Sequence, residues 1–130
     1  MKFIISLIVF SYPMELHMVF FNADYQDVTT AQFNFDGLVV LAYFFEISET
    51  DNVAYAKIID SLKYINKPHT SVKINDTFSL SSLLPKNRDN YFTYIGSLTT
   101  PPCSEGVRWI DFKHPIRLSH AQVKKNFELK

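Results

Sequence analysis

YIGSLTTPPC, residues 94–103, is the stretch that indicates the fold most clearly. It overlaps a segment, residues 91–98, in which aromatic and small residues alternate, a pattern typical of a β-strand. A Thr-Thr-Pro-Pro corner follows, and residues 107–112 are a second strand candidate that residues 116–118 can resume. The Pro101–Pro102 bond is a candidate for a cis peptide bond, because cis peptide bonds occur mostly before proline. The stretch therefore predicts two strands joined by a proline corner.

Three segments upstream of this corner also have strand patterns. Residues 13–22 alternate with period 2, so that polar Glu15 and His17 share one face. Residues 38–47 form a nearly continuous apolar run, which suits a central strand covered on both faces. Residues 72–74 are a short strand candidate. Strands therefore dominate, and a mainly-β or α+β fold is predicted.

Two helices are expected at the periphery of these strands. Residues 52–65 have helical spacing, with Asp51 or Asn52 available as N-cap. Ser119 caps a second helix that runs to about Phe127. The connections look antiparallel, because only the helix near residue 58 could serve as a crossover between parallel strands.

Composition and charge describe one globular domain. The chain has 130 residues, and domains typically run to roughly 100–200 residues. Its 47% hydrophobic and 15% aromatic residues exclude intrinsic disorder, which requires low hydrophobicity and high net charge. Thirteen basic and thirteen acidic residues leave no net charge. That balance removes the electrostatic argument for a nucleic acid or an anionic membrane as partner.

The first eleven residues form an apolar start. Residues 3–10 are apolar apart from Ser6. This run is too short for a transmembrane span, which takes about 20 residues. One early lysine and a short apolar core are typical of a weak signal peptide, although no small-x-small cleavage site follows. A buried strand and a start codon inside a longer gene are the alternatives.

Glu15 and His17 are the first candidates for chemistry. They are two residues apart on a strand, so their side chains point the same way, about 6.6 Å apart along it. A carboxylate and an imidazole among apolar residues are costly unless they are paired or bound to something. Two interpretations stay open: a core histidine satisfied inside the protein, or a zinc ligand whose ring is oriented by a neighbouring acceptor.

Three motifs together resemble the α-carbonic anhydrase family. They are PMELHMV at 13–19, DGLVVL at 36–41 and the YIGSLTTPPC stretch, and they occur in the family's order at compatible spacing. The resemblance extends over residues 12–130. We therefore interpret residues 12–130 as part of a carbonic anhydrase domain, and residues 1–11 as an apolar start that does not match it.

The resemblance implies a zinc enzyme, a lyase that hydrates carbon dioxide reversibly to bicarbonate. Its fold would be a large, twisted, mostly antiparallel sheet with peripheral helices, and its zinc would lower the pKa of bound water to about 7. His17 matches the family's third zinc histidine, and Glu15 matches the carboxylate that accepts the other ring N–H. Thr99 matches the catalytic threonine that accepts a hydrogen bond from zinc-bound hydroxide. The substrate pocket implied in this way consists of Val19, Val40, Leu98, Thr100, Val107 and Trp109.

The sequence departs from the family in its zinc ligands. Nothing in it resembles the upstream His-x-His-Trp strand that carries the other two histidines, and a catalytic zinc needs three protein ligands. His69, His114 and His120 do not alternate with His17 on its strand and are not expected to replace them. We therefore expect this chain alone to be inactive unless it is a fragment of a longer protein. The alternatives are a non-catalytic relative that acts as a binding module, and a truncated gene of an active enzyme.

The resemblance also favours a secreted or membrane-anchored lineage. Cys103 resembles a cysteine of such members, which pairs with one near the N-terminus that this chain lacks; a free buried thiol is the alternative. Asn75-Asp76-Thr77 is a glycosylation sequon. Carbon dioxide and bicarbonate are the expected small-molecule partners. Self-association is expected through the exposed edge of the strand that bears His17.

Overall fold

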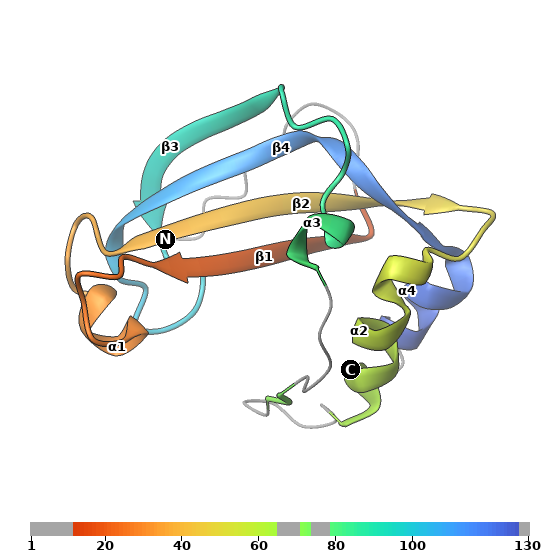
Figure 1. The fold of residues 1–130 in the computed structure, drawn as a ribbon, viewed down its shortest axis with the longest axis horizontal. Helices are drawn as coiled ribbons and strands as arrows, with labels where there is room; N and C mark the ends of the chain where they lie inside the picture. Colours follow the sequence, from red (N-terminus) through yellow and green to blue (C-terminus); the bar gives the residue numbers. More distant parts are fainter. Residues whose placement is uncertain (1–11, 65–70, 74–78, 128–130) are drawn as a thin grey trace.

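The computed structural model describes residues 12–64, 71–73 and 79–127, and it is organised around one sheet of four strands (Figure 1). The strands lie in the order β1-β2-β4-β3. Their bounds are Met14–Phe21 for β1, Leu38–Ser48 for β2, Tyr91–Ser97 for β3 and Glu105–Ser119 for β4. Short helices lie around the sheet, so the mainly-β or α+β class predicted from the sequence is confirmed.

The sheet is mixed rather than wholly antiparallel. β1 pairs antiparallel with β2, and β3 pairs antiparallel with β4, whereas β2 and β4 run parallel. The expectation of antiparallel connections is thus wrong for the central pair. Parallel neighbours need a crossover of a dozen or more residues. The chain between β2 and β4 provides it, and it contains the helix near residue 58 that the sequence offered as a crossover.

The helices are short, and most of them lie at the two ends of the sheet (Figure 1). The helix predicted at 52–65 is present as η1 (Val53–Tyr55), α2 (Ala56–Ser61) and η2 (Leu62–Tyr64). The helix predicted after Ser119 is α4 (His120–Phe127). The remaining helices are α1 (Val28–Ala31) and α3 (Leu80–Leu83). Residues 71–73 form no strand, so the prediction of a strand at 72–74 is wrong over its described part.

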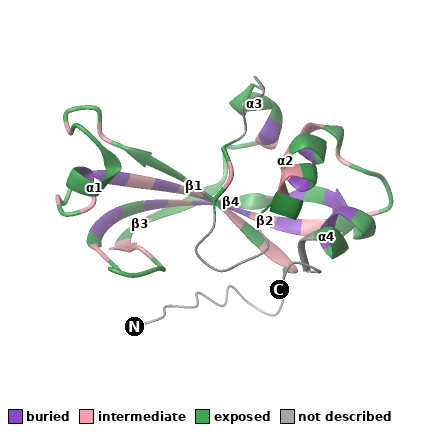
Figure 2. Ribbon diagram, turned by 90° about the horizontal axis from the view of Figure 1, so that it is seen from below, coloured by how far each residue is buried: buried purple, intermediate pink, exposed green. Residues whose placement is uncertain are grey.

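The two faces of the sheet carry separate hydrophobic clusters. On one face, which we call the helix-covered face, side chains of β2 and β4 pack with those of η1, α2, α3 and α4. On the other face, which we call the site face, the described residues that pack against the sheet come from α1 and the adjoining segments. It carries Ala31, Leu38, Val40, Ala42, Val107 and Trp109 as its buried residues. Burial follows the central strands β2 and β4, as Figure 2 shows, because both are flanked by other strands.

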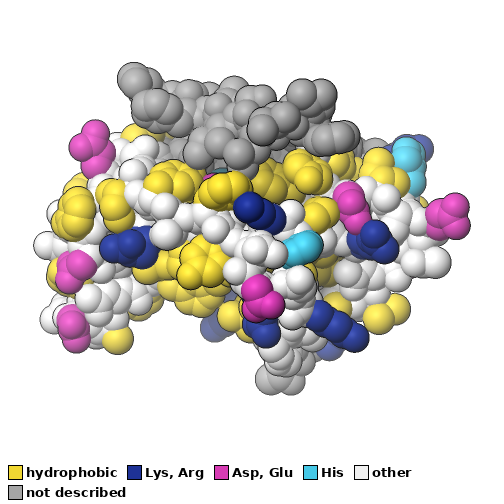
Figure 3. Space-filling model, turned by 90° about the horizontal axis from the view of Figure 1, so that it is seen from above, with side chains coloured by type: hydrophobic (Ala, Val, Ile, Leu, Met, Phe, Trp, Pro, Cys, Tyr) yellow, Lys and Arg dark blue, Asp and Glu magenta, His cyan; other side chains and the backbone are white. Residues whose placement is uncertain are grey.

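Within the part of the chain that the structure describes, both outer strands present an edge. β1 pairs with β2 along its whole length, from Met14 opposite Phe45 to Phe21 opposite Leu38. No strand among the described residues pairs with its other side. Several large apolar side chains on the two outer strands are exposed, namely Val19, Phe20 and Phe21 on β1 and Tyr91, Phe92 and Ile95 on β3. Figure 3 shows hydrophobic side chains gathered along the surface viewed from above.

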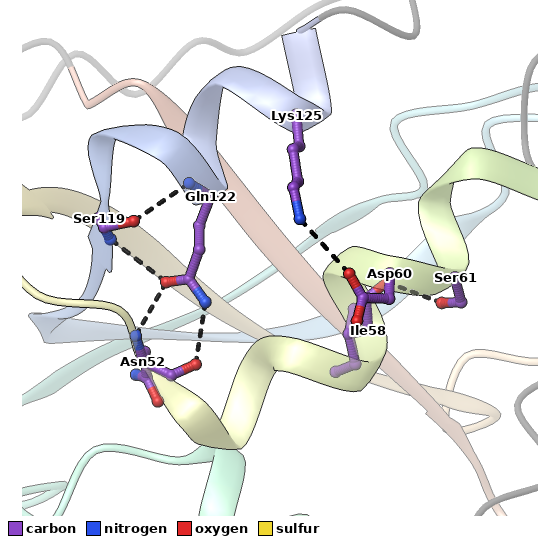
Figure 4. A network of polar contacts seen from close by, with 7 residues as sticks. All are labelled: Asn52, Ile58, Asp60, Ser61, Ser119, Gln122 and Lys125. Carbon is purple, nitrogen blue, oxygen red and sulfur yellow. Dashed lines mark hydrogen bonds and ion pairs between the residues drawn. The ribbon is translucent and has the colours of Figure 1, made fainter.

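A polar network ties the end of β4 to the start of η1 (Figure 4). The amide oxygen of Gln122 accepts from the backbone N–H groups of Asn52, at 2.9 Å, and Ser119, at 3.2 Å. Its amide nitrogen donates to the Asn52 carbonyl at 3.0 Å. The Ser119 hydroxyl caps α4 by accepting from the Gln122 N–H, and the Asn52 side chain caps η1. Both predicted caps are confirmed, with Asn52 rather than Asp51 in the first.

Candidate metal and substrate site

Glu15 and His17 lie side by side on β1, on the site face. The Nε2 atom of His17 is 2.9 Å from the Oε1 atom of Glu15, and the side chains are 31% and 41% exposed. The period-2 alternation of β1 produces this pairing, because residues two apart share a face. His17 is therefore a partly exposed, paired histidine and not one enclosed in the core.

The pairing determines which ring nitrogen of His17 stays available. An ionised carboxylate only accepts hydrogen bonds, so the His17 Nε2 atom must carry the proton that it shares with Glu15. In the neutral imidazole the lone pair then lies on Nδ1. A carboxylate that fixes the tautomer and orientation of an imidazole is the usual support of a metal-binding histidine. Given this pairing, Nδ1 is the His17 ring nitrogen whose lone pair can bind a cation or accept a proton.

Trp109 links His17 to the apolar part of the site. Its ring lies edge-on to the His17 ring, with centroids 4.8 Å apart and planes at 81°. Val19, Val40 and Trp109 stand in register across β1, β2 and β4, so their side chains share the site face. Val40, Val107 and Trp109 are buried, Leu98 packs against their cluster and Val19 is exposed. The structure thus brings Val40, Leu98, Val107 and Trp109 into one cluster, and Trp109 is the member that contacts His17.

Thr99 and Thr100 lie in the exposed corner after β3. The Pro101–Pro102 bond is cis, as predicted. The Cys103 N–H donates to the Thr100 carbonyl at 2.9 Å, and Cys103 has a positive φ of 57°. Cys103 is exposed, so the alternative interpretation as a buried thiol is wrong. Just before this corner, at the end of β3, the Ser97 carbonyl accepts a hydrogen bond from the Trp109 indole N–H at 3.1 Å.

Asp111 is a polar residue of this face that sequence reasoning missed. It stands in register with Ala42, which itself pairs with His17, and it is only 6% exposed. Burial raises the pKa of the Asp111 carboxyl and the Glu15 charge adds to this, whereas a hydrogen bond with Tyr94 and the nearby His17 lower it. The pKa of the Tyr94 hydroxyl is raised, mainly by burial and to a lesser degree by the charge of the nearby Asp111. The signal was present in the sequence, because Asp111 has the same strand parity as Val107 and Trp109.

A zinc ion needs more ligands than these residues bring together. A catalytic zinc takes three protein ligands. No group of three or more His, Cys, Asp or Glu side chains that could hold a metal occurs within residues 12–64, 71–73 and 79–127. His114 on β4 and His120 in α4 are exposed, and His69 lies outside the described residues. His17 supplies one imidazole, so the described residues alone do not fit a catalytic zinc.

Comparison with known proteins shows the family to which the chain belongs. A family model described as eukaryotic-type carbonic anhydrase matches residues 7–130. The chain therefore belongs to the carbonic anhydrase family. It is 45% identical over 111 residues to carbonic anhydrase 6 of Mus musculus, and 38% identical over 112 residues to carbonic anhydrase 15 of the same species. It is 36% identical over 113 residues to carbonic anhydrase 12 of Homo sapiens.

These alignments cover most of the chain but a smaller share of the relatives. They include 85% of the chain and 35% of each mouse protein, and 86% of the chain and 31% of the human one. The chain thus spans about a third of the length of the curated relatives it matches. Within the described residues, no helix is long and apolar enough to cross a membrane.

Proposed function

We propose that the chain supplies one zinc histidine and the apolar substrate wall of a carbonic anhydrase site that hydrates carbon dioxide reversibly to bicarbonate. The observation that carries this proposal is the 2.9 Å contact between His17 Nε2 and Glu15 Oε1, which leaves Nδ1 as the ligand atom. The ring contact with Trp109 supports it, since it brings His17 to the edge of the apolar cluster.

The other residues of the site take their roles from the same proposal. Thr99, at the exposed corner, is the catalytic hydroxyl, and Thr100 lies beside it on the pocket wall. Val40, Val107 and Trp109 form the buried part of the wall, where an uncharged, apolar molecule such as carbon dioxide loses no hydrogen bonds on entry. Val19 and Leu98 complete it.

Residues 1–130 alone are proposed not to hydrate carbon dioxide. One imidazole is a third of the ligand set that a catalytic zinc takes. Two further ligands would have to come from a longer protein or from a second chain. The lineage is proposed to be secreted or membrane-anchored, because an exposed thiol such as that of Cys103 is suited to a disulfide in an oxidising compartment.

Zinc titration tests the first part of the proposal. We expect the 130-residue chain to bind zinc at most a few-fold more tightly than its His17→Ala variant, because a single ligand without the other two contributes little. His120→Ala, at an exposed position in α4, is the control. Tight, stoichiometric binding that requires His17 would contradict the expectation and point to ligands from a second chain.

Restoring two histidines tests the second part. We would join the chain to a carbonic anhydrase segment that carries the His-x-His-Trp strand and measure carbon dioxide hydration by stopped flow. Thr99→Ala should lower the rate by about 10²-fold, as losing one positioned hydrogen bond does. Glu15→Ala should lower activity or metal affinity by about 10–100-fold, and His17→Ala should cost more. If zinc does not bind even then, the alternative of a non-catalytic binding module is favoured.

A further inference from the structure

The segment between β1 and β2, residues 22–37, is a closed loop at one end of the sheet (Figure 1). We call it the α1 loop, because it contains α1. Its two ends are joined, since the Asn22 N–H donates to the Gly37 carbonyl at 2.9 Å. Between these ends, the Tyr25 hydroxyl donates to the Asp36 carboxylate at 2.6 Å. Surface loops that are closed and internally bonded in this way are frequently functional.

Two close approaches of the backbone fix the shape of the α1 loop. A Cβ atom added to Gly37 would lie 1.8 Å from the Ala31 carbonyl oxygen. A Cβ atom added to Gly106 of β4 would lie 2.9 Å from the Cα atom of Phe35. The loop is thus packed tightly against itself and against β4. Its outward side chains are therefore held in place by the backbone that carries them.

Three large apolar side chains of the α1 loop face solvent. Phe33 is 69% exposed, Phe35 is 73% exposed and Val28 is 47% exposed. Single exposed apolar residues are ordinary on a protein surface, whereas several that gather in one place mark an interaction site. Because the loop is firmly held, Phe33 and Phe35 present their rings to a partner without first having to be ordered.

The charged side chains of the α1 loop are all acidic. The loop contains Asp24, Asp27 and Asp36, which are exposed, and it contains no lysine or arginine. The longer stretch of residues 3–56 also lacks lysine and arginine, although the chain as a whole has no net charge. The exposed apolar side chains are thus accompanied by negative charge only, which favours a positively charged partner.

The neighbouring end of β4 adds to this charge. Gly106, which lies against Phe35, is preceded by the exposed Glu105. Arg108 follows two residues later, but the alternation along β4 places it on the face opposite Val107. The start of β4 therefore contributes a carboxylate to the surroundings of the α1 loop.

We propose that the α1 loop is a docking surface for an arginine-bearing segment of another protein, whose guanidinium groups stack on Phe33 and Phe35 and pair with the carboxylates beside them. Arginine suits both features, because its planar guanidinium stacks on aromatic rings and bonds to carboxylates through two N–H groups. Asp27 accepts from the Thr30 N–H through Oδ1 only, and Asp36 accepts from Tyr25 through Oδ1 only. Each carboxylate thus keeps acceptor positions for the partner. The inference goes beyond the proposed function and depends on neither zinc nor carbon dioxide.

Peptide binding to the complete 130-residue chain tests the proposal. The probes are short fluorescein-labelled peptides in which glycine alternates with arginine, lysine or glutamate, and fluorescence anisotropy measures their dissociation constants. The arginine peptide should bind about 3-fold or more tightly than the lysine peptide, because an ammonium group pairs with carboxylates but lacks the planar stacking surface. The glutamate peptide should not bind, since the loop repels it.

Variants of the loop separate the aromatic from the acidic contribution. Phe33→Ser combined with Phe35→Ser should weaken binding of the arginine peptide by about 10-fold, because each exposed cation–π contact contributes a factor of about 2–5. Asp24→Asn should weaken it by about 2–5-fold, as the loss of one exposed charge pair does. Tyr64→Ser and Asp89→Asn remove an exposed aromatic ring and an exposed charge outside the loop and should leave the affinity unchanged.

Thermal unfolding checks that the variants remain folded. If the double variant does not fold, Phe33→Ser alone replaces it, because Phe35 and not Phe33 lies against Gly106. Phe33→Ser should then weaken binding of the arginine peptide by about 2–5-fold.

Four results would overturn the proposal. Equal binding of the arginine peptide to the parent and to the serine variant would exclude the rings, and equal affinities for arginine and lysine would reduce the contact to general charge. Phosphatidylcholine vesicles that bind the chain through Phe33 and Phe35 would assign the surface to a lipid. A serine variant that self-associates less in light scattering but binds the peptide as before would assign it to a second copy. None of these measurements uses zinc or His17, so their failure leaves the proposed function untouched.

Discussion

Tyr43 and Tyr55 are both fully buried on the helix-covered face, but their hydroxyl groups differ in their partners. The Tyr55 hydroxyl donates to the Leu83 carbonyl at 2.8 Å, and this bond joins η1 to α3. The Tyr43 hydroxyl has no partner among the described residues. Burial raises the pKa of both hydroxyls, so both are neutral at physiological pH. The two residues form a matched pair for measuring what a buried hydroxyl contributes.

Removing each hydroxyl should change stability in different directions. Tyr55→Phe should lower the free energy of unfolding by about 1–2 kcal/mol, because the Leu83 carbonyl is left without its donor. Tyr43→Phe should leave it unchanged or raise it by up to about 1 kcal/mol, because an unsatisfied group is removed. Urea unfolding of the two variants and the parent chain measures the difference. A loss in Tyr43→Phe equal to that in Tyr55→Phe would show that Tyr43 has a partner.

Single residues also show how far the sequence predicts the site. The pairing of Glu15 with His17 could be predicted, because period-2 alternation alone places both on one face of β1. The contact of His17 with Trp109 could not be derived from local patterns, since it depends on the register of three strands. Asp111 was missed for a different reason. The alternation of β4 places Asp111 on the same face as Val107 and Trp109, but a charged residue in a strand is ordinarily expected to be exposed, so its burial was not predicted.

For the helices and strands, the sequence predicts where an element begins and whether it is a helix or a strand better than it predicts which strand pairs with which. Both helix caps, at Asn52 and Ser119, follow from short-range side-chain chemistry and were found in the sequence. The parallel pairing of β2 with β4 was not, because it is decided by where a long crossover returns. What joins these elements is Gln122, which bonds to residues 70 and 3 positions away in the chain.

Gln122→Ala should therefore lower the free energy of unfolding more than the substitution of a polar residue usually does. The change leaves the part-buried N–H group of Asn52 and the buried N–H group of Ser119 without their acceptor, so the free energy of unfolding should fall by about 2–3 kcal/mol. Gln26→Ala, at an exposed position after β1, is the matched control and should change it by less than about 0.5 kcal/mol. Thermal and urea unfolding provide the measurement. Equal effects in the two variants would mean that the network in Figure 4 does not stabilise the fold.

For the whole molecule, the two edges of the sheet matter most. A strand edge presents unpaired N–H and C=O groups that can pair with another chain, especially where the neighbouring side chains are apolar. No strand among the described residues pairs with the outer side of β1, and Phe20 and Phe21 on β1 are exposed. For the 130-residue chain itself, we expect association through β1.

A lysine on β1 should reduce that association. Phe20→Lys removes an exposed aromatic ring from the edge and adds a charge, which is how natural proteins prevent edge-to-edge pairing. We expect the parent chain to form oligomers or aggregates in light scattering at micromolar concentration, and Phe20→Lys to shift the distribution toward the monomer. Phe33→Lys makes the same chemical change at an exposed site off the sheet, just after α1, and should have a smaller effect. A parent chain that gives a sharp monomer peak and a cooperative thermal transition would refute the expectation. Equal effects of the two lysines would assign the association to general surface hydrophobicity rather than to the edge of β1.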